Sequence, residues 1–162
     1  MKQSPEEMRI VDRMARGVLC RDGFLGDDAR PLGEIIDTDR STVQRLGVSN
    51  EQLAGRLAEI LLAAMSAMGA DVEAGRGLRA VYREAMGRIP CPWGEGVRFP
   101  KGEVELTQPA SGRTLRFSPL SVHLIGEHGF YQGRGSRYRI DPEALCDMLK
   151  PAPGADDTTK NA

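Results

Sequence analysis

The hydrophobic positions of the chain are most regular between residues 50 and 68, where they recur at the three- and four-residue spacing of an α-helix. Ser49 and Gln52 form a capping box at its start. From Ile60 to Met68 nearly every side chain is apolar or small, which is more than one buried face requires. We therefore predict a long helix covered on most sides, either by other helices or by a second subunit in a homodimer through Leu53–Met68.

Two further helices are predicted before this segment. The first begins at Ser4 and is expected to end near Cys20. A second apolar stripe begins at Leu32, but Asp39 occupies a position where the pattern requires an apolar residue. We predict that this helix stops near Asp39, which is then exposed, and that a short helix restarts at Thr42. A buried functional carboxylate at position 39 is the alternative.

The second half of the chain contains the strand signals. Residues 78–86 fit a helix and a strand almost equally well, and we predict a helix because the residue types favour it. Alternating apolar and polar residues over 104–107 and 114–117 predict a β-hairpin. A short helix over 118–129 and a last helix over 141–149 follow, each with a capping residue at its start.

These elements predict an α+β fold, with a mainly helical N-terminal part and a C-terminal β-hairpin–helix unit. We assign residues 1–150 to a single domain, in which 4–87 form the helical part and 88–150 the hairpin–helix part. Residues 151–162 are polar and rich in proline and glycine, so we predict a disordered tail.

The composition is that of a small globular protein. The chain has 162 residues and a net charge of −1, which gives no bulk attraction to nucleic acid or to a membrane. Three widely spaced cysteines do not indicate a disulfide framework. The N-terminus lacks the apolar region of a signal peptide, and the longest apolar run is too short to cross a bilayer. We therefore expect a cytoplasmic protein with no membrane partner.

Positive charge is concentrated in residues 88–140, which carry eight basic and four acidic side chains. Arginines lie among aromatic residues there, a combination that suits phosphate contact and base stacking. The leading hypothesis is a non-enzymatic protein that binds an anionic partner, nucleic acid among the candidates, through this surface; an ordinary solvated face is the simpler interpretation. The predicted contact residues are Arg113, Arg116, Tyr131, Arg134, Arg137, Tyr138 and Arg139.

The chain has only two histidines, His123 and His128, which follow the predicted hairpin, while Cys91 precedes it. This order is that of a small zinc module, so a zinc site of these three residues is one alternative. A metal-dependent or thiol enzyme that uses the same residues is another. However, the histidines are about 140° apart on an ideal helix, and the usual second cysteine is missing. We therefore expect no shared metal and no cofactor, with His128 stabilising the helix end and His123 contacting Glu127.

Three segments carry a resemblance to a known family: GFLGDDARPLGEII, RIPCPWGEGVRFPKGEV and RFSPLSVHLIGEHGFYQGRGSRYRIDPEAL. They are similar to an uncharacterised family of small bacterial proteins with no known activity. The resemblance extends over most of the chain except the two ends. It implies a bacterial, cytosolic protein, and it brings no activity, cofactor or site residue with it.

Overall fold

The computed structural model describes residues 3–150, so the tail predicted for 151–162 lies outside the described residues. The fold is α+β, as predicted. In chain order the elements are α1 (Pro5–Met14), α2 (Leu32–Arg45), α3 (Asn50–Ser66), β1 (Val72–Glu73), β2 (Arg79–Arg83), β3 (Arg88–Pro90), β4 (Arg98–Pro100), β5 (Glu103–Gln108), β6 (Arg113–Phe117), α4 (Pro119–His128) and α5 (Pro142–Leu149).

Four strands form an antiparallel sheet in the order β1-β2-β5-β6, and β3 pairs separately with β4. The predicted hairpin is β5–β6, in which Val104 lies opposite Phe117 and Leu106 opposite Leu115. Val104 and Leu106 are buried, whereas Glu105 between them is partly exposed. This alternation is the signature of a strand with one face on the core, and it is the pattern that the sequence displayed.

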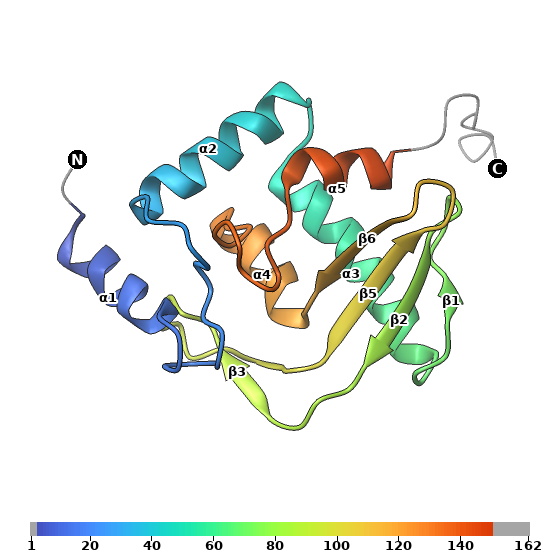
Figure 1. The fold of residues 1–162 in the computed structure, drawn as a ribbon, viewed down its shortest axis with the longest axis horizontal. Coiled ribbons are helices and arrows are strands. Elements are labelled where there is room, and N and C mark those ends of the chain that lie inside the picture. Colours follow the sequence, from blue (N-terminus) through green and yellow to red (C-terminus); the bar gives the residue numbers. More distant parts are fainter. Residues whose placement is uncertain (1–2, 151–162) are drawn as a thin grey trace.

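Helix α4 joins the two halves of the core, and Figure 1 shows it lying between α2 and the sheet. It packs closely on α3, because a Cβ atom added to Gly126 would lie only 3.1 Å from the Cβ of Ala54. Ile125 belongs to the hydrophobic cluster around α3 and the sheet, whereas Leu124 belongs to the cluster formed with α1, α2 and β3. The ends of α4 are as predicted, with Ser118 in a capping box and Gly129 left-handed at φ 61°.

The prediction that a helix stops at Asp39 is wrong. Helix α2 continues from Leu32 to Arg45, and Asp39 is buried, with 5% of its surface exposed. The carboxylate is tolerated inside because the guanidinium of Arg139 neutralises it, with Nη2 3.0 Å from Oδ1. Periodicity failed here because the partner lies 100 residues away in the sequence.

The helix predicted over 78–86 is also wrong, because β2 occupies residues Arg79–Arg83. Its pairing with β5 on one side and β1 on the other overrides the weak helix preference of the segment. The segment 4–87, which we predicted to be helical, thus supplies β1 and β2 to the sheet that contains the β5–β6 hairpin. Helix α1 ends at Met14 rather than near Cys20, since Ala15 is extended and Gly17 has φ 80°.

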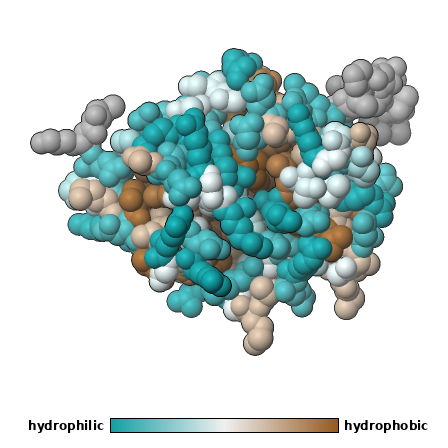
Figure 2. Space-filling model, viewed as in Figure 1, coloured by the Kyte–Doolittle hydropathy of each residue, from teal (hydrophilic) through white to brown (hydrophobic). Residues whose placement is uncertain are grey.

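Helix α3 is less enclosed than predicted. Leu57 and Ile60 are buried, but Leu62 is 67% exposed and Met68, just beyond the helix, is 92% exposed. A homodimer through Leu53–Met68 therefore stays a prediction. On the face seen in Figure 2 the surface is mostly hydrophilic, with small separate hydrophobic patches. Among the described residues, no helix has both the length and the hydropathy to span a membrane.

Candidate metal centre

The loop between β3 and β4 supplies half of the site. Its ends are joined by a hydrogen bond from the Cys91 amide to the Val97 carbonyl, 3.1 Å long. Gly94 and Gly96 both have positive φ, near 80°, so they allow the chain to turn tightly on either side of Glu95. Arg13 of α1 donates a hydrogen bond from Nε to the Pro92 carbonyl. The loop is thus held from both ends, and it presents one thiol and one carboxyl group.

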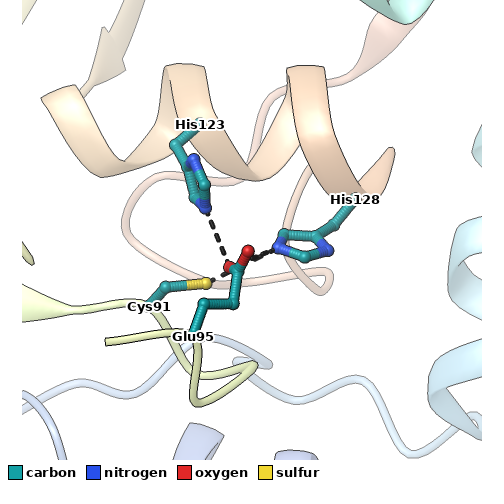
Figure 3. Close-up of side chains that lie close together, drawn as sticks. All are labelled: Cys91, Glu95, His123 and His128. Carbon is teal, nitrogen blue, oxygen red and sulfur yellow. Dashed lines mark hydrogen bonds and ion pairs between the residues drawn. The ribbon is translucent and has the colours of Figure 1, made fainter. Parts of the chain in front are cut away.

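Helix α4 supplies the other half. His123 is in its middle and His128 is its last residue. Figure 3 shows both imidazoles reaching from α4 toward the loop that carries Cys91 and Glu95. The ring centroids of the two histidines are 5.3 Å apart. The angle between the two positions on an ideal helix therefore does not keep the side chains apart.

The four side chains bring one ligand atom each to a common point. The thiol, the carboxylate oxygen and the two ring nitrogens all lie within 4.8 Å of one another. Oε1 of Glu95 is 3.0 Å from Nε2 of His123 and 2.7 Å from Nε2 of His128. Sγ of Cys91 is 3.7 Å from the same nitrogen of His128. Cys91 is buried, and each imidazole is mostly covered.

Aromatic side chains fix the orientation of both imidazoles. The indole of Trp93 stacks on His128, with centroids 4.1 Å apart and the planes 9° from parallel. Phe130 meets the edge of the same indole, and Phe99 of β4 contacts the ring of His123 at 4.9 Å. These rings also exclude water from one side of the site, which strengthens electrostatic interactions inside it.

The protonation of the cluster follows from this geometry. Burial raises the pKa of the Cys91 thiol to about 12, and the hydrogen bond with Glu95 adds to the shift. Hydrogen bonds from Cys91 and His123 lower the pKa of Glu95 to about 2. A thiol with this pKa is protonated at neutral pH, and it lies beside a carboxylate. That arrangement does not favour the thiol-enzyme interpretation, because a nucleophilic cysteine needs a depressed pKa.

The donor set fits zinc. Thiolate sulfur, imidazole nitrogen and carboxylate oxygen are the three ligand types that zinc takes from proteins. With ordinary zinc–ligand bond lengths, sulfur and nitrogen at two corners of a tetrahedron are about 3.6 Å apart, close to the observed 3.7 Å. The carboxylate oxygen is at hydrogen-bond distance from both nitrogens, so a small outward shift of Glu95 would complete the tetrahedron.

The sequence identified three of the four residues and missed the fourth. Cys91, His123 and His128 converge, and the geometric argument against their convergence is wrong. The fourth residue of the cluster is Glu95 rather than a second cysteine, and it contacts His123 where Glu127 was expected. One signal was available: Glu95 lies between two glycines, four residues after Cys91.

The predicted anion-binding residues are mostly engaged within the protein. Tyr131 is buried, and its hydroxyl donates to Asn50, so it is not available for base stacking. Arg139 is half-buried and engaged in the ion pair with the buried Asp39. The remaining members pair as follows: Arg113 with Asp147, Arg116 with Glu105, and both Arg137 and Tyr138 with Glu103.

Only Arg134 of this set has no side-chain hydrogen bond or ion pair to another described residue. Four of the five arginines already have an acidic partner, so this surface presents no cluster of free guanidinium groups. The geometry thus lends the nucleic-acid hypothesis no support.

Comparisons with family models, with curated proteins and with solved structures find no match for the chain. The resemblance to a family of small bacterial proteins stays a prediction.

Proposed function

We propose that Cys91, Glu95, His123 and His128 bind one divalent transition-metal ion, zinc in preference to others. The observation that carries the proposal is the convergence of four different ligand atoms within 4.8 Å, from two separate elements. Sulfur and imidazole ligands favour zinc over magnesium or calcium, which prefer oxygen.

The function of this ion is structural. Four protein ligands leave no open position for a substrate, as in structural zinc sites, whereas catalytic sites keep one position for water. The ion would tie the loop over 91–97 to α4. Because α4 joins both hydrophobic clusters, this tie fixes the loop to the centre of the molecule. The ion would then stabilise the fold rather than take part in a reaction.

A metal-free explanation of the same geometry competes with this proposal. One carboxylate can accept hydrogen bonds from a thiol and two imidazoles, and the observed distances suit such an arrangement. The two explanations differ in what purified protein contains. In the first, the ion copurifies and contributes to folding. In the second, the cluster is stable without any ion.

Metal analysis of untagged protein separates the two. We expect about one zinc ion per chain, and we expect Cys91→Ser to lose it together with a large part of the thermal stability. Cys20→Ser is the matched control, because Cys20 lies outside the cluster and should keep the ion. Protein that holds no metal, and whose melting temperature does not change with added zinc or chelator, would refute the proposal.

A further inference from the structure

A cavity lies at the start of α4, away from the candidate metal centre. Its volume is about 300 Å³, a size in the range of small-molecule sites. Its apolar wall is formed by Phe24, Ile89 and Leu120, which all belong to the cluster around α1 and α2. None of the four metal-centre residues lines it.

Gln132 is the residue that points to a ligand. It is 3% exposed, lines the cavity, and adopts φ 69°, a conformation that costs a non-glycine residue free energy. Its side-chain oxygen accepts from Ser136 Oγ at 2.6 Å, and its carbonyl accepts from Arg139 at 3.0 Å. The side-chain nitrogen has no hydrogen-bond partner among the residues described.

A donor without a protein partner normally meets solvent or a ligand, because buried donors are paired. Among the described residues, no side-chain nitrogen or oxygen is both fully buried and without a partner. The Gln132 nitrogen must therefore reach open space, and the cavity is the space that this residue lines. A residue with positive φ and a side-chain donor free of protein partners, in the lining of a cavity, is a reason to look for a ligand there.

The charge around the cavity is positive. Lys101 lines it, its stem passes over Gly87, and its ammonium has no ion pair within residues 3–150. Arg21 also lines the cavity without an ion pair in that range, and Asp22 is the acidic residue of the lining. Arg137 is already paired with Glu103. With Arg137 paired, Lys101 and Arg21 against Asp22 leave one net positive charge, so the lining offers a hydrogen-bond donor and a small positive charge beside an apolar wall.

We propose that this cavity binds a small monoanion with an apolar body, a medium-chain carboxylate being the simplest member of the class. The apolar part would lie against Phe24, Ile89 and Leu120. The carboxylate would accept a hydrogen bond from the Gln132 amide and lie within reach of Lys101. A single charge fits better than a phosphate group, because the site has one buried donor rather than a cluster of free arginines.

The test is an NMR titration of the full chain, purified with whatever metal it carries, with sodium octanoate as the probe. We expect saturable shifts at the amides of Phe24, Ile89 and Gln132. Octanol, which has the same chain without the charge, should bind about tenfold more weakly. Gln132→Glu keeps the acceptor for Ser136 and replaces the free donor by a carboxylate, so it should weaken octanoate binding about tenfold or more.

Two further variants test the charge and the space. Lys101→Met should weaken octanoate binding several-fold, whereas Lys150→Met, an equal change of charge away from the cavity, should not. Ala85→Trp would fill the cavity from its exposed edge without disturbing the core, and should abolish binding. The proposal is overturned if binding does not saturate at about 10 mM octanoate. It is also overturned if the Gln132→Glu and Ala85→Trp proteins melt like wild type and bind octanoate as tightly as wild type does.

Discussion

Asp39 of α2 and Arg139, 100 residues later, form a bidentate ion pair in the interior. Their side chains are 17% exposed for Arg139 and 6% for Asp39, so water solvates the two charges much less than at the surface. We predict that Asp39→Ala destabilises the protein by about 3 kcal/mol or more, because it leaves a buried guanidinium without its partner. Urea unfolding measures this loss.

The control for this pair is Asp37→Ala. Asp37 pairs with Arg40 on the surface, and the side chains of both are more than half exposed, so its loss should cost about 0.5 kcal/mol or less. The double variant Asp39→Leu/Arg139→Met should lose less stability than Asp39→Leu alone. A loss in the double variant equal to the sum of the losses in Asp39→Leu and Arg139→Met would show that the pair has no coupling.

Asp28 provides a pH-dependent prediction. Its side chain is almost fully buried, and the hydrogen bond from Arg30 holds its pKa well below the ordinary 3.8. A carboxyl group whose pKa falls on folding stabilises the protein above its unfolded pKa, and this contribution is lost as pH falls through the folded pKa. Asp28→Asn should therefore be less stable than wild type at pH 6, and the difference should shrink below about pH 3.8.

Thermal unfolding at a series of pH values checks this prediction. Asp27→Asn is the matched control, since the neighbouring Asp27 is highly exposed and pairs only with the exposed Arg16. It should follow the wild-type stability at every pH. A difference for Asp28→Asn that is constant from pH 6 to 2 would contradict the assigned shift.

Replacing glycine by alanine should have opposite effects on stability at Gly133 and at Gly55. A Cβ atom at Gly133 would lie 2.2 Å from the carbonyl oxygen of Leu25, so Gly133→Ala must move backbone and should cost about 2 kcal/mol or more. A Cβ atom at Gly55, inside α3, would meet nothing within 4 Å. Gly55→Ala should therefore stabilise the protein by about 0.5–1 kcal/mol. Melting temperatures that move in the same direction would contradict the packing described here.

A substitution at Trp93 tests the candidate metal centre without changing any of its four proposed ligands. Its indole stacks on His128, so it holds the imidazole toward Cys91 and Glu95. Trp93→Ala should weaken zinc binding about tenfold or more, because residues that orient a ligand commonly contribute that much. Trp93→Phe keeps an aromatic ring and should retain most of the affinity. Competition with a coloured chelator measures both, and unchanged affinity of Trp93→Ala would remove the orienting role.

Local chemistry was sufficient to predict part of the fold. The caps at Ser118 and Gly129 and the alternation in β5 and β6 are signals read within a few residues, and each is found as predicted. The errors have a common cause. Residues 79–83 become a strand because β5 lies beside them, and Asp39 is buried because Arg139 reaches it. Neither partner can be deduced from the local sequence.

The candidate metal centre shows the same limit. Cys91 and the histidines could be named from residue type, but their convergence depends on a loop folding back on a helix about 30 residues further along the chain. The ideal helix angle was misleading because it describes where side chains leave the backbone. Imidazole side chains can lean along the helix surface, and His128 is at its last position, where the neighbouring turn no longer restricts it.

The absorption spectrum of the cobalt(II)-substituted protein tests the central claim most directly. Four-coordinate cobalt with one thiolate absorbs strongly in the visible region and shows a sulfur-to-metal charge-transfer band. We predict both features with one equivalent of cobalt, loss of the charge-transfer band in Cys91→Ser, and displacement of cobalt by zinc. Glu95→Gln should retain the sulfur band while changing the visible bands, since we propose the carboxylate as the fourth ligand. A weak spectrum like that of hydrated cobalt, unchanged by any of these substitutions, would contradict the claim.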